Sequence, residues 1–429
     1  MKILIMSYGT RGDVQPYVAL GRGLQARGHA VTIATAGRFE GFVTSHGLGF
    51  APLSDAMLAV IDTPQGRAML ENTENALQSL FRMVRMLPQV GPMQRALIED
   101  CWTAAEATQP DLIVFHPKAY AAPAIAEKLG VPVVLALLMP LLVPTASAPM
   151  MGFPDLRAGW WNRSTYKLAG WLIGLSAGKY VRATRSAHGL PRRRGFNIAR
   201  SADGRPIPIL HAVSPSVLPP PADWPDWARM SGYWFLDEGD WTPPQALVDF
   251  LAAGPPPVCV GFGSMAGRSP TRLGHAVVEG LGQAGLRGII ATGWGGLEPG
   301  DLPDTILQID AAPHDWLFPR MAAVVHHGGA GTTAAAIRAG RPQLVVPFFG
   351  DQPWWGKKVH GLGLSPPPLP QKKLTAANLA EALCEVTADE KIAAAAEQLG
   401  AKVRQEDGVA RAIADIEALT GLSLAESAV

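Results

Sequence analysis

The chain has 429 residues, of which 48% are hydrophobic and only 17% charged; this excludes a disordered protein and, at about 100–200 residues per domain, predicts two to three folded domains. Its 37 Lys and Arg nearly balance its 36 Asp and Glu, and the net charge of +1 argues against a globally basic nucleic-acid binder, so we expect no nucleic-acid partner. The three cysteines (Cys101, Cys259 and Cys384) show no CxxC or Cys/His spacing, which argues against a disulfide framework or a zinc site and fits a reducing cytosol.

Neither a signal peptide nor a membrane span is predicted. Met1-Lys2 leads directly into Ile3–Met6, an apolar run too short for the hydrophobic region of a signal peptide. The most apolar stretch, 131–149, contains four prolines, whereas a spanning helix needs about 20 mostly apolar residues in one continuous helix. We therefore expect a cytoplasmic protein.

The first half of the chain alternates short apolar runs with helical patterns. Continuous apolar strands that alternate with helices are typical of a parallel sheet covered on both faces. The predicted strands are 2–8, 30–36, 111–116 and 131–138, and the predicted helices are 14–28, 119–130 and a helical stretch over 69–108 that is broken near Pro88 and Pro92.

The same alternation begins again after a proline-rich segment. Proline-rich sequence is stiff and extended, as in an interdomain linker. The second set of predicted strands is 258–262, 288–292, 305–310, 322–326 and 343–347. We predict an α/β protein with an N-terminal domain over 1–218, a linker over 219–240, a second domain over 241–408 and a C-terminal helix, 409–429, that packs back on the first domain. The two Rossmann-like domains are expected to face each other across a ligand-binding cleft, at the carboxyl ends of their strands.

The loop after the first strand carries a carboxylate. The sequence Gly-Thr-Arg-Gly-Asp-Val-Gln-Pro, residues 9–16, joins this strand to the first helix and is not a GxGxxG dinucleotide fingerprint. In one interpretation Asp13 only caps the helix from Val14. In the other, the loop presents the Asp13 carboxylate to a ligand.

Two further loops contain small residues suited to an anion. Gly-Phe-Gly-Ser-Met, residues 261–265, follows a strand and can turn backbone N–H groups and the Ser264 hydroxyl toward an anion. The alternative is that these residues only let the chain change direction, as in most turns of this kind. His-His-Gly-Gly-Ala-Gly-Thr-Thr, residues 326–333, follows another strand and opens a helix. Its N-terminus suits a phosphate or a diphosphate, and His327 can add a donor. The alternative is tight strand–helix packing with an incidental histidine pair.

A fourth loop, residues 347–353, follows the last strand of the second domain. Its adjacent carboxylate and carboxamide, Asp351 and Gln352, can bind several sugar hydroxyls. The alternative is that Asp351 caps a helix beginning near Pro353, and both roles can hold together.

These loops, in this order, resemble the family 1 glycosyltransferases of GT-B architecture, and among them the sterol 3-beta-glucosyltransferases and the bacterial glycopeptide-type enzymes. The resemblance covers nearly the whole chain. Its most specific parts are APHDWLFP at 312–319, HHGGAGTTAAAIRAG at 326–340 and PFFGDQPWWG at 347–356.

The resemblance implies a role for each loop. Asp13 matches the general base of the family. Independently of the resemblance, His116 is the second candidate base, because it ends the 111–116 strand and could reach the same cleft. Asp351 and Gln352 match the pair that binds the donor sugar. The residues that match the diphosphate contacts are Ser264, His327, Gly329, Ala330, Gly331 and Thr332.

The implied activity is inverting transfer of a hexose, glucose in the first instance, from UDP-glucose to a hydroxyl of a hydrophobic acceptor such as a sterol, a terpenoid or a lipid. No metal and no cofactor are implied. Ala311 stands where plant members stack the base on Trp, so a natural-product glycosyltransferase that uses a dTDP- or UDP-sugar stays an alternative. Alternatives of another class are a non-catalytic nucleotide- or lipid-binding protein and a nucleotide-sugar epimerase.

One segment has a charge unlike the rest. Residues 157–205 contain eleven Lys and Arg and one acid, Asp203, which gives a local charge of +10, with five Trp and Tyr among the cations. At 100° per residue, Trp161, Leu168, Trp171, Leu172 and Leu175 fall within one arc. This pattern predicts peripheral contact with the inner face of a membrane, against the alternative of a core-packed helix with a solvated basic end.

Overall fold

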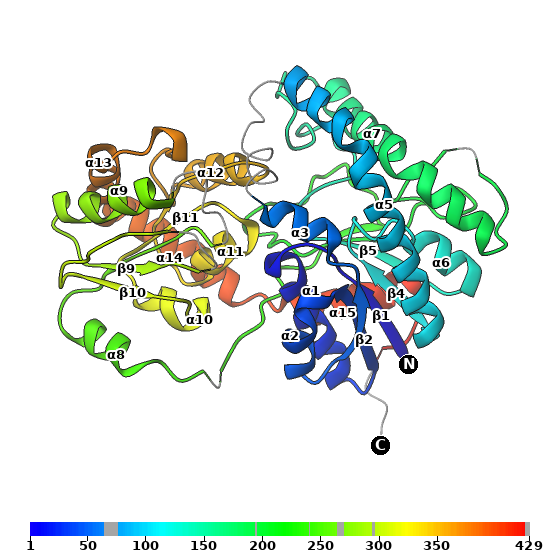
Figure 1. Ribbon diagram of the computed structural model, residues 1–429, viewed down its shortest axis with the longest axis horizontal. Helices are drawn as coiled ribbons and strands as arrows, with labels where there is room; N and C mark the ends of the chain where they lie inside the picture. The colour runs from blue at the N-terminus through cyan, green and yellow to red at the C-terminus, as the bar shows by residue number, and fades with distance from the viewer. Residues whose placement is uncertain (64–75, 194, 240, 264–269, 294–296, 425–429) are drawn as a thin grey trace. The chain divides into compact units, whose positions relative to one another are not determined.

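The computed structural model describes the chain except for residues 64–75, 194, 240, 264–269, 294–296 and 425–429, and except for the side chains of 61, 62 and 76–90 (Figure 1). The chain divides into two compact units. The first contains Met1–Asp62, Leu80–Leu236 and Glu406–Val429, and the second contains Thr63–Ser79 and Asp237–Gln405. Each unit is built on its own parallel sheet.

The first unit is built on a seven-stranded sheet with the order β3-β2-β1-β4-β5-β6-β7, in which all the neighbouring strands are parallel. The four predicted strands are all present, and the sequence analysis missed β3, β6 and β7. The last two strands have three residues each. The strands are β1 (Lys2–Met6), β2 (Ala30–Ala36), β3 (Gly49–Leu53), β4 (Leu112–Phe115), β5 (Val133–Leu137), β6 (Ile209–His211) and β7 (Ala228–Met230).

β7 lies inside the segment assigned above to a linker. It pairs with β6, and residues up to Leu236 belong to the first unit, so the chain passes to the second unit only between Leu236 and Asp237. The prolines between Leu218 and Pro225 therefore lead to an edge strand, a place where proline is tolerated because one side of the strand needs no ladder hydrogen bonds.

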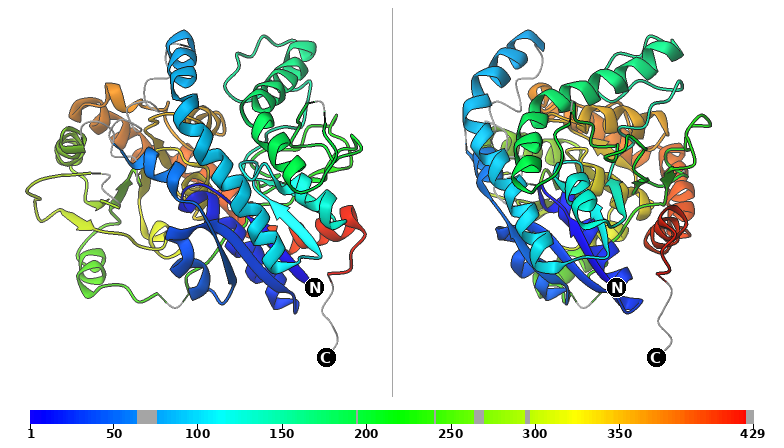
Figure 2. Two further views of the ribbon diagram at one scale, coloured as in Figure 1. Left: turned by 45° about the vertical axis from the view of Figure 1, so that its right-hand side comes forward. Right: turned by 90° about the vertical axis from the view of Figure 1, so that its right-hand side faces the viewer.

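Long helices cover the first sheet (Figures 1 and 2). The predicted break near Pro88 and Pro92 is wrong, because α5 runs through both prolines without interruption. The helices of this unit are α1 (Arg11–Ala26), α2 (Glu40–Ser45), α3 (Ala56–Asp62), α5 (Ala76–Thr108), α6 (Ala122–Leu129), α7 (Gly159–Ala187) and α15 (Gly408–Thr420), with a 3-10 turn at Gly37–Phe39.

The C-terminal helix α15 packs in the core of the first unit. Its Ile413 and Ile416 join the same buried cluster as Leu20 and Leu24 of α1. Its Asp415, almost fully buried, pairs with Arg229 of β7 at 3.0 Å. Apolar burial and the ion pair between the buried Asp415 and Arg229 therefore both fix this helix.

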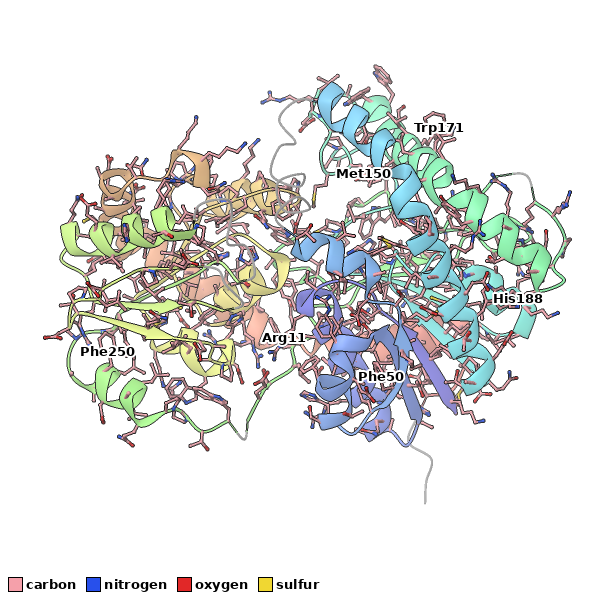
Figure 3. The ribbon with its side chains drawn as sticks, in the orientation of Figure 1. Arg11, Phe50, Met150, Trp171, His188 and Phe250 are labelled. Carbon is pink, nitrogen blue, oxygen red and sulfur yellow. The ribbon has the colours of Figure 1, made fainter. Side chains whose placement is uncertain are left out.

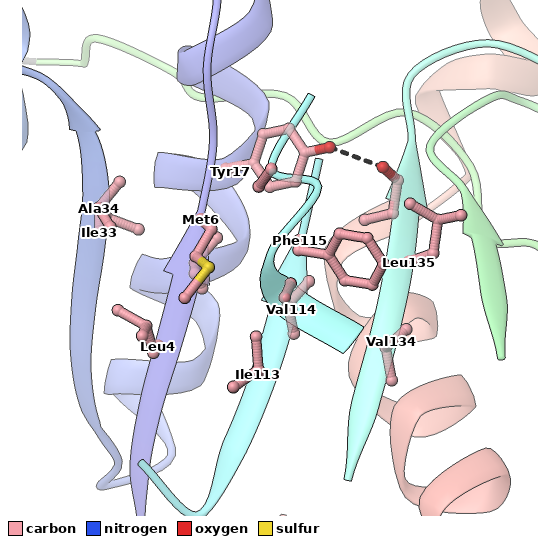
Figure 4. Close-up of a cluster of buried hydrophobic side chains, with 14 of the residues drawn as sticks. Leu4, Met6, Tyr17, Ile33, Ala34, Ile113, Val114, Phe115, Val134 and Leu135 are labelled. Carbon is pink, nitrogen blue, oxygen red and sulfur yellow. Dashed lines mark hydrogen bonds between the residues drawn. The ribbon is translucent and has the colours of Figure 1, made fainter. Parts of the chain in front are cut away.

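The core beneath the first candidate site is apolar and closely packed (Figure 4). Leu4 and Met6 of β1 lie between Ile33 of β2 and Val114 of β4, all with almost no exposure. The hydroxyl of the buried Tyr17 donates to the carbonyl of Ala136 at 2.7 Å, which ties α1 to β5. This core holds the first turn of α1 in a fixed position above the end of β1.

The second unit contains a five-stranded parallel sheet with the order β10-β9-β8-β11-β12. All five predicted strands are present. They are β8 (Val258–Gly261), β9 (Gly288–Ala291), β10 (Ile306–Ile309), β11 (Ala323–His326) and β12 (Gln343–Val345). The helices are α8 (Gln245–Ala252), α9 (Pro270–Gln283), α10 (His314–Leu317), α11 (Ala330–Arg338), α12 (Gln352–Gly361), α13 (Ala376–Ala388) and α14 (Glu390–Arg404), with 3-10 turns at Phe318–Arg320 and Gln371–Lys373.

Both strand orders reverse direction at one point, between β1 and β4 in the first sheet and between β8 and β11 in the second. In open α/β sheets, ligands bind outside the carboxyl ends of the strands at such a switch point. Asp13 follows β1 and His116 follows β4, while the 326–333 loop follows β11. Each unit therefore places predicted site residues at its own switch point.

Candidate functional site

Asp13 lies in the first turn of α1. The helix begins at Arg11 with Thr10 as its N-cap, so the predicted helix start at Val14, with Asp13 as its cap, is wrong. Asp13 is instead the third helical residue, and its Oδ2 accepts the backbone N–H of Thr10 at 2.8 Å and the Thr10 hydroxyl at 3.3 Å. This is the reciprocal half of a capping box, and it holds one carboxylate oxygen in place.

The loop before α1 requires glycine at position 9. Gly9 has φ +152°, and a Cβ atom built on it would lie 2.0 Å from Oδ2 of Asp13. A side chain at this position would displace the carboxylate. The glycine therefore leaves room for Asp13 at the end of β1.

Two residues of the loop after β4 face the two oxygens of Asp13. His116 Nε2 lies 3.6 Å from Oδ1, and Lys118 Nζ lies 3.6 Å from Oδ2. The His116 side chain is 7% exposed, that of Asp13 is 27% exposed and that of Lys118 is 48% exposed. The site thus has a buried imidazole at its base, a carboxylate that solvent reaches and a cation at its rim.

Protonation states follow from these surroundings. Burial raises the pKa of the Asp13 carboxyl, but the contact with His116, the charge of Lys118 and the Thr10 amide outweigh burial and hold this pKa well below its usual range. Burial lowers the pKa of His116, an effect that Lys118 reinforces and Asp13 opposes. At neutral pH, Asp13 is therefore ionised and His116 is neutral.

In the second unit, His326 supports the glycine-rich loop from below. It is fully buried, its Nε2 contacts Oε1 of Gln343 at 2.8 Å, and its Nδ1 accepts the N–H of Gly328 at 3.0 Å. Gly328 has φ +87°, and a Cβ on it would lie 2.7 Å from Val345 Cγ1. His326 and Gly328 thus fix the turn between β11 and α11.

His327 and the first turn of α11 form the candidate anion site. Gly329 is the N-cap of α11, and as glycine it brings no capping side chain, so the backbone N–H groups of the first turn point outward uncapped. The His327 ring lies beside Gly329, and its Nδ1 is buried with no hydrogen-bond partner among the described residues. Burial, then His326 and His314, lower the pKa of His327 to about 3, so the ring is neutral and donates a single N–H.

The remaining predicted residues differ in how the structure places them. Gln352 is buried, and its Oε1 accepts the N–H groups of Phe348 at 2.8 Å and Phe349 at 3.2 Å, which fixes the side chain at the end of β12. Asp351 is the N-cap residue of α12, and its side chain makes no capping bond to that helix. Ser264 lies outside the described residues.

Each unit brings one kind of chemistry. The first presents an ionised carboxylate that can take a proton. The second presents uncapped N–H groups at a helix N-terminus, where a positive partial charge of about half an electron favours an anion. In the described part of the chain, no group of three or more His, Cys, Asp and Glu is arranged to hold a metal ion.

Comparisons with known proteins match two separate segments of the chain. Residues 3–146 match the model of the glycosyltransferase family 28 N-terminal domain, and residues 293–419 match that of the erythromycin biosynthesis protein CIII-like C-terminal domain. The sterol 3-beta-glucosyltransferase of Emericella nidulans is 37% identical over 449 residues, which cover 100% of this chain and 31% of that protein. The enzyme of the same name from Neosartorya fischeri is 38% identical over 96% of this chain and 29% of its own length.

The chain has the GT-B fold, and its N-terminal part matches a glycosyltransferase family domain. It spans about a third of the length of the curated relatives it matches. Solved structures share the fold: the glycosyltransferase of kitacinnamycin has a TM-score of 0.70 and 21% identity, covering 98% of this chain and 99% of its own. Glycosyltransferase VinC in complex with dTDP has a TM-score of 0.69 and 21% identity, covering 98% and 100%.

Three residues of the candidate site were not predicted from the sequence. Lys118 lies two residues beyond His116. Its place in the loop directly after a predicted strand could have identified it as a residue of the site. Gly9 was named only as the first residue of the 9–16 loop. His326 was grouped with His327 as a pair, although it ends a buried strand and therefore supports the loop instead of facing a ligand.

Proposed function

We propose that this chain is an inverting glycosyltransferase that moves a hexose, glucose, from UDP-glucose to a hydroxyl of a hydrophobic acceptor such as a sterol, a terpenoid or a lipid. The observation that carries the proposal is the ionised Asp13 at the switch point of one sheet together with an anion-binding helix terminus at the switch point of the other. The identity of 37–38% to proteins named sterol 3-beta-glucosyltransferase supports this choice of sugar and acceptor.

In the proposed reaction, Asp13 takes the proton of the acceptor hydroxyl as its oxygen bonds to the anomeric carbon. The bond from that carbon to the nucleoside diphosphate breaks on the opposite face, and the diphosphate leaves with the electron pair. Asp13 does not need a raised pKa for this, because the hydroxyl becomes acidic only as the new bond forms. The products are a glycoside of inverted configuration, a nucleoside diphosphate and one proton.

The leaving diphosphate gains negative charge, and the second unit stabilises it. The N–H groups of Ala330, Gly331 and Thr332 and the N–H of His327 are held in place before the reaction, so they need no reorganisation as charge develops. Ser264 is a further proposed donor to the diphosphate. Asp351 and the NH₂ group of Gln352 are proposed to bind the sugar hydroxyls. No cofactor takes part in this scheme.

A turnover assay tests the proposal. The chain is incubated with UDP-glucose, with and without a sterol, and release of UDP and formation of the glycoside are measured. We expect UDP release that depends on the acceptor. Release of an altered sugar without acceptor would indicate an epimerase, and donor binding without turnover would indicate a non-catalytic binding protein.

A second candidate is a natural-product glycosyltransferase that uses a dTDP-sugar. It is favoured by the small Ala311, which stands where plant members of the resembled family stack the base on Trp, and by the fold shared with VinC, whose structure contains dTDP. Thermal-shift measurements with UDP and dTDP discriminate the two, because a ligand at 100 times its Kd adds about 2.7 kcal/mol. Stabilisation by dTDP alone would reject UDP-glucose as the donor.

His327 and Asp351 should affect different parts of the donor. We expect His327→Ala to weaken binding of the nucleoside diphosphate itself, because it removes a fixed N–H donor. Asp351→Ala should leave that binding unchanged and raise the KM for the sugar nucleotide. Calorimetry with UDP and kinetics with UDP-glucose separate the effects. An equal loss of UDP affinity in both variants contradicts the assignment.

An apolar surface lies along α7. Six of the eight exposed large hydrophobic residues in the described part of the chain are Leu156, Trp160, Leu168, Trp171, Leu172 and Leu175. Trp161, predicted to belong to this face, is partly buried and donates to the carbonyl of Pro154 at 2.9 Å, whereas Trp160 is 73% exposed. Figure 3 shows Trp171 on the outer side of the helix. We call the five residues of α7 in this set the α7 face.

We propose that the α7 face contacts the inner surface of a membrane peripherally. No helix in the described ranges is long and apolar enough to cross one. Exposed cations flank the apolar residues, namely Arg163, Lys167, Lys179 and Arg182. Tryptophan beside an apolar stripe with flanking cations is typical of a helix that lies in the interface of an anionic bilayer.

Co-sedimentation with vesicles containing phosphatidylserine checks this contact. The triple variant Trp160→Ala, Trp171→Ala, Leu175→Ala should bind about ten-fold more weakly or worse, since it removes most of the inserted apolar surface. Val248→Ala, an exposed apolar change in the second unit, is the control. High salt should reduce binding of the wild type. Absence of binding at low salt rejects the proposal.

A further inference from the structure

The loop after β4 contacts the proposed base at both of its oxygens. His116 faces Oδ1 and Lys118 faces Oδ2, each at 3.6 Å. The backbone joins the two, because the N–H of Lys118 donates to Nδ1 of His116 at 3.2 Å. One three-residue segment therefore supplies an imidazole, an ammonium group and the amide that orients the imidazole.

The Lys118 amide fixes the tautomer of His116. A backbone N–H can only donate, so Nδ1 of His116 accepts this bond and has no hydrogen. The neutral ring then carries its single hydrogen on Nε2, the atom that faces Asp13. In this tautomer the His116 nitrogen that faces Asp13 carries a hydrogen and has no free lone pair. His116 is therefore a donor to Asp13 and not the second candidate base considered above.

The same contacts distinguish the two oxygens of Asp13. Oδ2 accepts from the backbone and side chain of Thr10 and faces Lys118. Oδ1 faces only His116 among the partners the structure describes. Because a carboxylate oxygen has two lone pairs, Oδ1 keeps one for the acceptor hydroxyl. The 3.6 Å separation from His116 suits a contact that shortens when substrate binds.

We propose that His116 and Lys118 are positioning residues: Lys118 fixes the Nε2–H tautomer of His116 through its amide and retains Oδ2 through its ammonium group, so that Oδ1 of Asp13 is the oxygen that takes the proton. This rests on the proposed function for its catalytic meaning. The contacts themselves are independent of turnover, and so are the first two tests.

The tautomer is tested by long-range ¹H–¹⁵N NMR on the full chain labelled with ¹⁵N-histidine, without donor or acceptor. The His116 signal is identified by its absence from His116→Asn. We expect a nitrogen pattern with hydrogen on Nε2 and none on Nδ1. A ring with hydrogen on Nδ1, or one that averages both tautomers, overturns the inference.

Titration of the same signal tests the two charges. The titratable groups that face His116 in the described residues are Asp13, Lys118 and Tyr17, whose ring contacts it edge-on at 5.9 Å. Lys118 disfavours the imidazolium, so Lys118→Met should raise the pKa of His116. Asp13 favours it, so Asp13→Asn should lower that pKa. Lys128→Met, an exposed change on α6, should leave it unmoved. Shifts of the same sign in the first two variants contradict the geometry.

Kinetics separate positioning from loop support. In His116→Gln the side-chain NH₂ group reaches the Nε2 position and still donates to Asp13. In His116→Asn the carboxamide oxygen replaces Nδ1 and keeps the Lys118 amide bond, but nothing reaches Asp13. Loss of a hydrogen bond to a charged group should lower kcat in His116→Asn by about ten- to a hundred-fold, while His116→Gln keeps most of it. The opposite order overturns the positioning role.

These outcomes distinguish the inference from the proposed function. If no acceptor supports transfer but the NMR results hold, the proposed function fails and the placement of the three groups stands. If transfer occurs and His116→Asn is as active as the wild type, only the inference fails.

Discussion

Asp13→Asn should lower kcat by about 10²–10⁴-fold, the usual contribution of a general base. A carboxamide cannot take a proton at neutral pH, so the chemical step loses its acceptor. Folding should be unaffected, because the Asn side-chain oxygen can still accept the Thr10 N–H that Asp13 accepts at 2.8 Å. A residue with only a capping role would make this change nearly silent in kcat.

The measurement needs three readouts. Single-turnover rates with the best acceptor report the chemical step, calorimetry with UDP reports the diphosphate site, and thermal unfolding reports stability. We expect only the first to change, since the proposed diphosphate site belongs to the second unit. A variant that keeps more than about a tenth of kcat would remove Asp13 as the base. His116 would not replace it without a change of tautomer.

Strands with continuous apolar sequence could be predicted. Ile3–Met6 of β1 and the pair Val324 and Val325 of β11 are buried on both faces of their sheets, and such strands have an unmistakable pattern. β6 and β7 were not predicted, and their pairing depends on partners distant in sequence. Length alone does not explain this, because β12 also has three residues and lies at an edge of its sheet, yet its apolar run continues through Val346 and made it predictable.

Helix boundaries show a second limit. The prolines at 88 and 92 suggested a break, yet α5 is continuous through both. Proline lowers helix stability locally, but tertiary packing can supply more than this loss. The predicted start of α1, Val14, is three residues too late, because the helix begins at Arg11. Asp13 is therefore not the N-cap residue, and its carboxylate instead accepts the backbone N–H of Thr10.

The candidate site could be predicted in its parts but not in its contacts. Asp13 and His116 were selected as alternatives, each at the end of a strand. The structure places them at neighbouring strand ends, as partners. The sequence does not show that the backbone N–H of Lys118 points at Nδ1 of His116. The tautomer of His116 follows from that one contact. Roles assigned to single residues change once their hydrogen-bond donors are known.

A buried ion pair joins α6 to α7 and has the largest expected effect on stability. The Arg185 side chain is 6% exposed, and its two terminal nitrogens donate to the two oxygens of Glu127 at 2.5 and 3.1 Å. A further bond runs from Arg185 to the carbonyl of Pro191 at 3.1 Å, while its Nε is buried with no partner among the described residues. Glu127 therefore supplies the negative charge that compensates this buried cation.

Glu127→Ala should destabilise the first unit by about 3–5 kcal/mol, because it leaves the Arg185 charge buried with one carbonyl as its partner. Glu127→Gln keeps one acceptor and should cost less. The neighbouring exposed change Lys128→Ala should stay within about 0.5 kcal/mol of the wild type. Guanidinium denaturation of each variant gives the change in the free energy of unfolding for Glu127→Ala, Glu127→Gln and Lys128→Ala. If Glu127→Ala is too unstable to measure, Glu127→Gln is compared with the double variant Glu127→Gln, Arg185→Met. The double variant should regain part of the lost free energy of unfolding, because no buried charge then remains. A cost below about 1 kcal/mol for Glu127→Ala would show that water reaches Arg185 and that the pair does not hold α7 in place.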